Sequence, residues 1–346
     1  MELLLDALRG GAAGRILEEA LPGLDDAWLP GPHGRHLVEL VVPLVPRRPR
    51  GRRRAVDAAA PADPPAASVR KRPPGSDWLF LRLDCPPVLQ DDLIVDRLAA
   101  FAEFARSAAL ADDWFFIRYA DPEPHLRLRL HGPPDVLRTQ LLPQAIAWAQ
   151  ALVRDEVCTR FALDTYDREV ERYGGPDGVE LAERIFGADS RAVASLLGLE
   201  PDTPGLDRTA LAVAGIDGLL AGLGLSRPDR LAWYVAYVPL GREDGQDYRA
   251  RRGVLRALLT GAAATRPGGA APAAALAAHR RALEPLGTRL RALHDAGRLT
   301  APAGALLRSL VHMHCNRLLG TEAPREERAL RLARRAVESL ERAPAA

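Results

Sequence analysis

Leucines alternate with cationic and titratable residues along positions 125–131, which read His-Leu-Arg-Leu-Arg-Leu-His. A period of two is typical of a β-strand with one buried face, so we expect the leucines in the core and the other side chains opposite them. That opposite face is a solvated sheet surface or a binding surface. The guanidinium groups of Arg127 and Arg129 repel each other, and their donors suit two carboxylates, or a carboxylate and an oxyanion. The strand therefore offers a place for an anionic ligand.

Acid–base chemistry is indicated in residues 309–317, Ser-Leu-Val-His-Met-His-Cys-Asn-Arg. With helical spacing His314 falls on the apolar side, which predicts a core histidine. His312 falls on the polar side with Ser309 and Asn316. An imidazole oriented by either of those side chains is the best acid–base candidate in the chain. A metal site is not expected here, because neighbouring side chains on a helix diverge.

Dense charge also marks residues 164–175, Asp-Thr-Tyr-Asp-Arg-Glu-Val-Glu-Arg-Tyr-Gly-Gly. Read as a helix, the segment places Arg168 and Arg172 on one face. This pattern fits a surface helix with paired charges as well as a segment that contacts a ligand. A second face then carries the side chains of Tyr166, Glu169 and Tyr173.

An antiparallel sheet with surrounding helices is expected to position these side chains. Apolar runs predict strands over 78–83, 114–119 and 125–131, the last two joined as a hairpin by the turn at 121–124. The segment 261–278 is rich in Ala, Pro and Gly, which predicts a mobile loop or a poor helix. The fold class is therefore α+β, one large mixed domain. Helices are predicted over residues 91–109, 137–153, 180–186, 190–199, 303–319 and 326–340.

A short appendage and a linker are expected to precede this domain. We place the appendage at residues 1–46, with a strand over 34–46, the linker at 47–73 and the main domain at 74–345. The linker is rich in Arg, Pro and Ala, a composition that cannot bury enough apolar area to fold. It holds six arginines within 47–54, so the rest of the chain has a net charge of 2 − 6 = −4. Charge therefore does not indicate a nucleic-acid-binding surface on the folded body.

Composition excludes several function classes. The chain has 346 residues, a net charge of +2 and 47% apolar residues, a balance typical of soluble globular proteins. Lys71 is its one lysine and lies in the expected linker, which argues against pyridoxal phosphate and P-loop chemistry. The three cysteines are far apart, so neither a disulfide framework nor a zinc site is expected. We expect a cytoplasmic protein with no cofactor and no membrane span.

Six stretches occur in a recognisable order along the chain: 74–80 (Pro-Gly-Ser-Asp-Trp-Leu-Phe), 114–122 (Trp-Phe-Phe-Ile-Arg-Tyr-Ala-Asp-Pro), 125–129, 164–175, Asp189-Ser190 and 309–317. Together they resemble the C-terminal elimination domain of class I lanthipeptide dehydratases, found also as the thiopeptide-type bacteriocin biosynthesis domain. The resemblance spans residues 74 to 320. Residues 28–39 resemble the end of the larger glutamylating domain of such enzymes, most of which this chain lacks. We therefore expect a stand-alone protein of the split type.

What the resemblance implies is a lyase step. In such systems a glutamyl-tRNA-dependent partner esterifies Ser or Thr of a ribosomal precursor peptide with glutamate. The elimination domain then expels glutamate and leaves dehydroalanine or dehydrobutyrine. The implied partners are a separate glutamylation subunit and the precursor peptide, with no nucleic acid bound directly and no membrane.

The resemblance also implies residue roles. Arg127 and Arg129 would hold the glutamyl carboxylates, Arg172 or less favourably Arg168 would add a third cation, and His312 would carry the proton. Further substrate contacts are implied for Arg118, Tyr119, Tyr166, Arg168, Glu169, Asn316 and Arg317.

Two other functions fit the same resemblance. One is a thiopeptide macrocyclase of this fold that joins two dehydroalanines in a formal [4+2] cycloaddition. The other is a non-catalytic subunit that presents peptide to a partner. Cycloaddition uses no glutamate and does not require paired arginines with His312, so their joint presence favours elimination.

Overall fold

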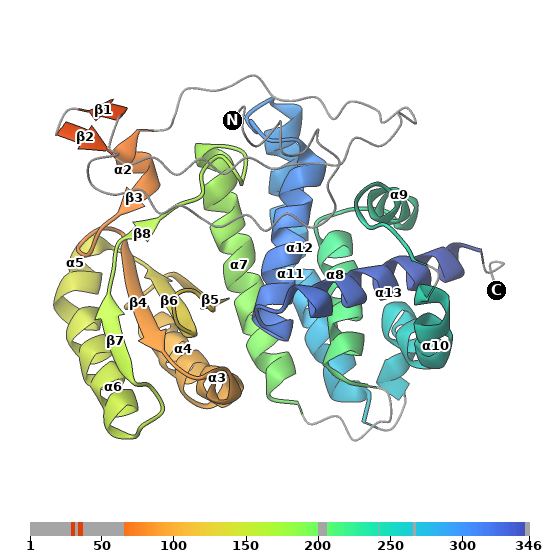
Figure 1. The fold of residues 1–346 in the computed structure, drawn as a ribbon, viewed down its shortest axis with the longest axis horizontal. Helices are drawn as coiled ribbons and strands as arrows, with labels where there is room; N and C mark the ends of the chain where they lie inside the picture. The colour runs from red at the N-terminus through yellow and green to blue at the C-terminus, as the bar shows by residue number, and fades with distance from the viewer. Residues whose placement is uncertain are drawn as a thin grey trace, which may run out of the picture. The chain divides into compact units, whose positions relative to one another are not determined.

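A computed structural model describes residues 29–31, 34–36, 66–199, 206–241, 243–265 and 268–342 (Figure 1). The chain divides into two compact units, Met1–Val56 and Asp57–Ala346. In the first unit, β1 (Leu29–Gly31) and β2 (Gly34–His36) form an antiparallel hairpin. The strand predicted over 34–46 is thus seen at its first three residues, and the remainder lies outside the described part of the chain.

Ordered structure in the second unit begins before the predicted domain boundary. Residues 66–73, which composition placed in the linker, contain the short helix α2 (Ala67–Arg70) and the strand β3 (Lys71–Arg72). The strand forms because β8 (Tyr166–Asp167) pairs with it, a long-range contact that composition cannot reveal. The predicted linker residues 47–65 lie outside the described residues.

Four strands form the main antiparallel sheet, in the order β5-β6-β4-β7. The three predicted strands and the predicted hairpin are confirmed. Arg129 lies opposite Phe80 and Phe115 in the register, and Arg127 lies opposite Arg82 and Ile117. These side chains therefore share one face of the sheet. The strands are β4 (Trp78–Asp84), β5 (Asp113–Tyr119), β6 (His125–His131) and β7 (Arg160–Leu163).

The other face of the sheet carries the leucines. Leu126, Leu128 and Leu130 are fully buried, as their spacing predicts. Helices cover this face, and the indole of Trp114 donates to Glu103 at 2.9 Å across the contact. One continuous helical stretch comprises α3 (Pro87–Asp92), the π-helical turn η2 (Leu93–Leu98) and α4 (Ala99–Ser107). A second comprises α5 (Pro134–Val136), η3 (Leu137–Leu141) and α6 (Leu142–Arg154).

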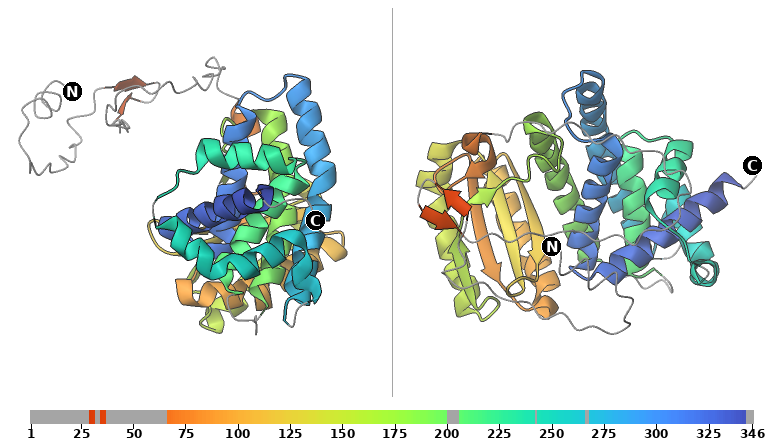
Figure 2. Two further views of the ribbon diagram at one scale, coloured as in Figure 1. Left: turned by 90° about the vertical axis from the view of Figure 1, so that its right-hand side faces the viewer. Right: turned by 45° about the horizontal axis from the view of Figure 1, so that its top comes forward.

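Two helices, α7 (Pro176–Leu197) and α12 (Ala303–Leu319), cover the free edge of β5. Ser190 on α7 accepts a hydrogen bond from the Phe116 amide at 3.2 Å. On α12, Asn316 accepts from the Arg118 amide at 3.0 Å and donates to its carbonyl at 2.9 Å. Side chains of α7 and α12 thus satisfy main-chain hydrogen-bonding groups at the free edge of β5. These hydrogen bonds hold both helices beside the sheet (Figure 2).

The helices predicted over 180–186 and 190–199 are one helix, α7, so the predicted break is wrong. Ser190 lies inside the helix, and its hydroxyl accepts a hydrogen bond from β5. Gly187 also lies inside the helix. It gives room to Asp113, whose carboxylate a side chain at that position would strike.

The remaining helices form a bundle in which α8 contacts α11, α12 and α13. Of the two alternatives for 261–278, a mobile loop or a poor helix, the helix is observed beyond Gly269, because α11 begins at Ala270. Its alanines favour helix, and Pro272 lies in the first turn, where the missing amide costs little. The bundle holds α8 (Arg208–Gly222), α9 (Arg227–Tyr237), α10 (Asp244–Thr260), η4 (Ala262–Thr265), α11 (Ala270–Asp295) and α13 (Ala323–Glu341).

No single helix among the described residues is long and apolar enough to span a membrane. Helices α8 and α9 reach that length and apolar content only together, and the pair is bent by 119° at its break.

A buried ionic cluster ties three of the long helices together. The carboxylate of Asp189 on α7 accepts from His314 at 2.7 Å and from Arg317 at 2.9 Å, and His279 on α11 lies 3.2 Å away. His314 is fully buried, so its prediction as a core histidine is confirmed. Burial alone would raise the pKa of Asp189, but the attraction of His314 and Arg317 holds it well below its usual range.

Removing this charge is expected to destabilise the fold. Asp189→Asn leaves Arg317 buried without its counterion, which lowers the free energy of unfolding by about 3 to 5 kcal/mol. Urea denaturation at pH 7 measures the loss. The matched control is Asp177→Asn on the same helix, where the exposed pair with Arg298 is worth roughly 0 to 1 kcal/mol.

The pH dependence has a defined sign. Because the pKa of Asp189 is depressed by folding, its contribution is complete above the unfolded-state pKa and is lost as pH falls below about 4. The stability gap between wild type and Asp189→Asn therefore narrows on acidification. A gap that is constant or widens would contradict this account of the cluster.

Candidate functional site

Two arginines of β6 rest on aromatic rings on the face of the sheet opposite the leucines. The guanidinium carbon of Arg127 lies 3.5 Å from the ring centre of Tyr119. That of Arg129 lies 4.0 Å from Tyr166 and 4.7 Å from Phe80. Such stacking holds a guanidinium group in place while leaving its edge donors unused.

Neither arginine forms an ion pair with a carboxylate of the described residues. Arg129 is 5% exposed, and its Nε finds no hydrogen-bond partner among them. Burial lowers the pKa of both Arg129 and Arg127, yet a guanidinium group stays protonated in proteins. A buried cation without a counterion is costly, so this face is suited to an anionic ligand.

His125 fixes the direction of Arg127. Its Nδ1 lies 2.7 Å from the Glu123 carbonyl and donates to it, so its Nε2 accepts from Arg127 Nε at 3.0 Å. Burial lowers the pKa of His125, which favours this neutral form. The remaining donors of Arg127 are left for a ligand.

The segment 164–175 is a short strand followed by a turn, so its prediction as a helix is wrong. The segment begins with extended backbone, because β8 pairs with β3. It ends at Gly174 and Gly175, which adopt φ of +85° and +97°. Without helical spacing, Arg168 and Arg172 point to different partners.

The structure separates the two alternatives for the third cation. Arg168 is buried and donates to Glu183 with two nitrogens, Nε at 2.7 Å, so it serves the fold. Arg172 is part-exposed and donates to Glu169 at 3.1 Å and to Ser309 at 3.3 Å. Burial opposes a rise in the pKa of Arg172, but attraction to Tyr173 and Glu169 raises it. Glu169 and Arg172 follow Tyr166 within six residues, and the Tyr166 ring lies against Arg129.

His312 lies on α12 between two contacts that this helix makes with the arginine-bearing elements. Ser309, one turn before it, contacts Arg172, and Asn316, one turn after it, holds the main chain of Arg118. Residues at these spacings are neighbours on the surface of a helix, so His312 lies beside the contact between Ser309 and Arg172. Its side chain is 44% exposed and therefore open to a ligand.

The orienting partner of His312 was not among those predicted. Its Nδ1 lies 2.8 Å from the carboxylate of Glu326, whereas Ser309 and Asn316 bond elsewhere. Glu326 belongs to the first turn of α13, and nothing in the sequence links it to His312 across the intervening turn. Only the packing of α13 on α12 reveals the pair.

Three other predicted substrate contacts serve the fold instead. Arg118 is buried and binds Asp91 at 2.5 Å, and Arg317 is fully buried against Asp189. Asn316 closes the edge of β5, so its polar atoms are occupied. Their types resembled those of binding residues because a buried ionic network uses the same groups. Of the predicted site residues, the structure brings Arg127 against Tyr119 and Arg129 against Tyr166. Arg172 pairs with Glu169 and also contacts Ser309, which lies one turn before His312.

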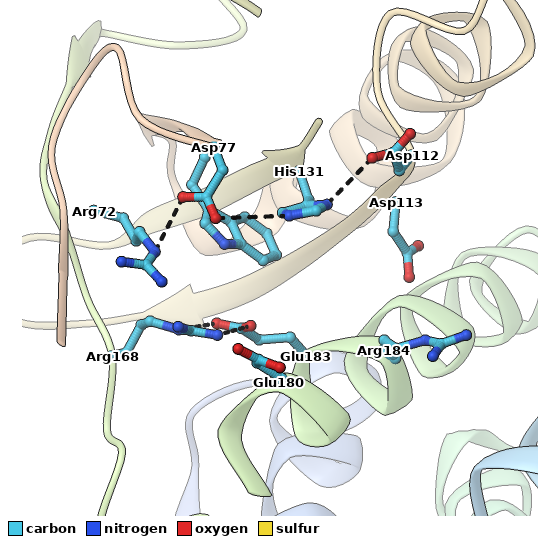
Figure 3. A pocket seen from close by; sticks show the side chains of 10 residues that line it. Arg72, Asp77, Asp112, Asp113, His131, Arg168, Glu180, Glu183 and Arg184 are labelled. Carbon is cyan, nitrogen blue, oxygen red and sulfur yellow. Dashed lines mark hydrogen bonds and ion pairs between the residues drawn. The ribbon is translucent and has the colours of Figure 1, made fainter. Parts of the chain in front are cut away.

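A cavity of about 440 Å³ lies beside the ends of β4, β5 and β6 (Figure 3). Its charges largely pair with one another: Arg72 with Asp77 at 3.0 Å, and His131 with Asp77 and Asp112 at 3.8 and 3.5 Å. The pair of Arg168 and Glu183 forms part of its wall. Neither the arginines of β6 nor His312 line it, so we do not place the chemistry there. Within the described part of the chain, no group of three or more His, Cys, Asp or Glu residues is placed to hold a metal ion.

Comparisons with known sequences agree with one family. The family model described as "Lantibiotic biosynthesis dehydratase C-term" matches residues 78–337. Subtilin biosynthesis protein SpaB of Bacillus subtilis is 34% identical over 163 residues, which are 46% of this chain and 15% of that protein. Nisin biosynthesis protein NisB of Lactococcus lactis subsp. lactis is 30% identical over 207 residues, 59% of this chain and 20% of that protein. The chain thus spans a fifth or less of the length of these relatives.

Solved structures give the same fold. The tRNA-dependent lantibiotic dehydratase MibB from Microbispora sp. 107891 superposes with a TM-score of 0.68 and 29% identity, over 81% of this chain and 29% of that one. The pyridine synthase TbtD from thiomuracin biosynthesis superposes with a TM-score of 0.53 over 77% of this chain and 99% of that one. It is 20% identical, so the likeness concerns the fold alone.

The different surroundings of the two candidate arginines predict different costs of truncation. Arg168→Ala leaves Glu183 buried and unpaired and lowers the free energy of unfolding by about 3 to 5 kcal/mol. Arg172→Ala, at a part-exposed pair, changes it by roughly 1 kcal/mol or less. Urea titration of both variants checks this, and equal losses would contradict the assignment of Arg168 to the fold.

Proposed function

The chain belongs to the lantibiotic dehydratase C-terminal family, and we propose that it catalyses β-elimination of glutamate from glutamylated Ser or Thr of a ribosomal precursor peptide. The products are dehydroalanine or dehydrobutyrine and free glutamate. The reaction class is that of a lyase.

One observation carries this proposal. Two arginines without carboxylate counterions lie side by side on β6, with the exposed imidazole of His312 on the neighbouring helix. An acidic leaving group needs the first feature, and removal of a proton needs the second. Arg172, between the two, connects them through Ser309.

The chemistry assigns one role to each group. His312 Nε2 takes the Cα proton of the esterified residue, and the Cα electrons form the Cα=Cβ bond. The Cβ–O bond breaks, and its electron pair leaves with the glutamyl carboxylate. Arg127, Arg129 and Arg172 bind the carboxylates of the departing glutamate, and their charge stabilises the anion as it develops. Tyr119, Tyr166 and Glu169 hold those guanidinium groups in place.

We further propose that a separate glutamylation protein supplies the esterified peptide. The described residues offer an anion site for glutamate and a base, and these suit the second half of a dehydration.

Truncating the site is expected to stop elimination without unfolding the protein. Arg127→Ala and His312→Ala should each slow glutamate loss from a purified glutamylated peptide by roughly 10²- to 10⁴-fold. Mass spectrometry follows the esterified and dehydrated peptides over time. Matched controls are Arg138→Ala, whose exposed side chain pairs with Asp135, and His294→Ala, which is exposed in the last turn of α11.

Each outcome of this experiment has a clear reading. Accumulation of intact glutamylated peptide with both variants, and normal turnover with both controls, supports the proposed lyase. Undiminished dehydration by either variant contradicts the site. If wild type leaves the peptide unchanged, the lyase function is overturned in favour of a subunit that only presents peptide.

Glu326 is expected to act through His312. Because its carboxylate accepts from Nδ1, the lone pair of the imidazole is kept on Nε2. Glu326→Gln should lower kcat at least about 10-fold with little change in KM, and Glu326→Asp should restore part of the rate. Nitrogen-15 NMR of His312 is expected to show loss of the single Nδ1–H tautomer in Glu326→Gln. An unchanged tautomer together with a normal kcat would contradict this role.

A further inference from the structure

A cavity of about 460 Å³ adjoins His312. Its lining residues belong to the end of α9, the middle of α12 and the first turns of α13. A volume of this size is ample for one or two amino-acid side chains. None of the arginines of β6 lines it, so it is distinct from the anion site.

The walls of this cavity are apolar. Trp233 and Val238 are almost wholly buried, and Val311 is 1% exposed. Trp233 is fixed by a hydrogen bond from its Nε1 to the Gly304 carbonyl at 3.3 Å, and its ring packs against Tyr237 at 5.5 Å. The apolar surface is therefore rigid and open to a ligand.

The rim carries charges of both signs. Glu326 bonds to His312, and Glu327 pairs with Arg331 at 3.2 Å. Arg308 is exposed and lies one turn before His312. A neutral apolar group can enter such a cavity against Trp233 and Val311, whereas a charged side chain would lose its hydration there.

We propose that this cavity is a specificity subsite that binds the apolar side chain of a precursor-peptide residue next to the glutamylated Ser or Thr. The inference rests on the proposed function. His312 belongs to both sites: it takes the Cα proton of the reacting residue, and it forms part of the cavity wall. Consecutive Cα atoms are 3.8 Å apart, so the residue that extends past His312 into the cavity is an immediate neighbour in the peptide.

The subsite is tested with three glutamylated peptides that differ beside the modified serine, carrying Leu, Gly or Lys there. The scan is made on the N-terminal and the C-terminal side in turn. For wild type we expect kcat/KM at one of the two positions to follow the order Leu, Gly, Lys, with Leu over Lys by about 10-fold or more. Equal rates for Leu and Lys on both sides would overturn the subsite.

Filling the cavity gives the matched comparison. Ala323 lines it at the exposed first residue of α13, and Ala270→Trp makes the same change at the exposed first residue of α11, outside the cavity. In Ala323→Trp the ratio of Leu to Lys should fall to about 1, and in Ala270→Trp it should equal that of wild type. A preserved ratio in Ala323→Trp would overturn the proposal. If its melting temperature shows a folding defect, Glu327→Trp places an indole in the cavity from a second exposed position.

Failure of the subsite can be told apart from failure of the proposed function. Calorimetry with the unesterified Leu and Lys peptides measures binding without any elimination. A preference for Leu that Ala323→Trp removes supports the subsite even when no peptide is dehydrated. Conversely, elimination from all three peptides at one rate retains the lyase and overturns the subsite.

Discussion

A buried positive charge without a counterion is the constraint on which the site depends. Arg129 is almost wholly removed from water, and its neighbours on the sheet are the rings of Phe80 and Tyr166. Aromatic faces attract a cation without neutralising it, so the guanidinium group keeps its affinity for an anion. A carboxylate of the protein in that place would have stabilised the fold at the expense of binding. The nearby acid, Glu183, is instead taken by Arg168.

Helix α12 links the arginine-bearing part of the fold to the proposed proton acceptor. Its side chains contact α7, β5, Arg172 and α13. His314 and Arg317 face the core and bind Asp189, which fixes the rotation of the helix about its axis. Asn316 fixes its height against β5. With rotation and height both set, Ser309 contacts Arg172 and His312 contacts Glu326. The buried ionic cluster thus fixes the helix that carries the proposed proton acceptor.

The sequence predicted the sheet and the residues on its faces because a period of two is a local property. For β6 the pattern was complete, and both the buried leucines and the opposed arginines are where it places them. The spacing of α12 likewise separated the core His314 from the exposed His312. Residues 164–175 were misread since their structure depends on pairing with β3, which lies about 95 residues earlier in the chain. The roles of Arg118, Arg168 and Arg317 were lost for the same reason, because a local pattern cannot show that a distant carboxylate already occupies a guanidinium group.

The C-terminal helices complete the site, which the sequence resemblance did not reveal. That resemblance ends near residue 320, while the family match continues to residue 337 and so includes most of α13. Glu326 on this helix is the direct partner of His312, and the apolar cavity has α13 as one of its walls. In the proposed elimination, β6 would supply the charge for the leaving group, α12 the imidazole, and α13 the carboxylate that orients it. Because these three elements come from both halves of the fold, a chain that ended after α12 would keep the anion site and lose the group that orients the base.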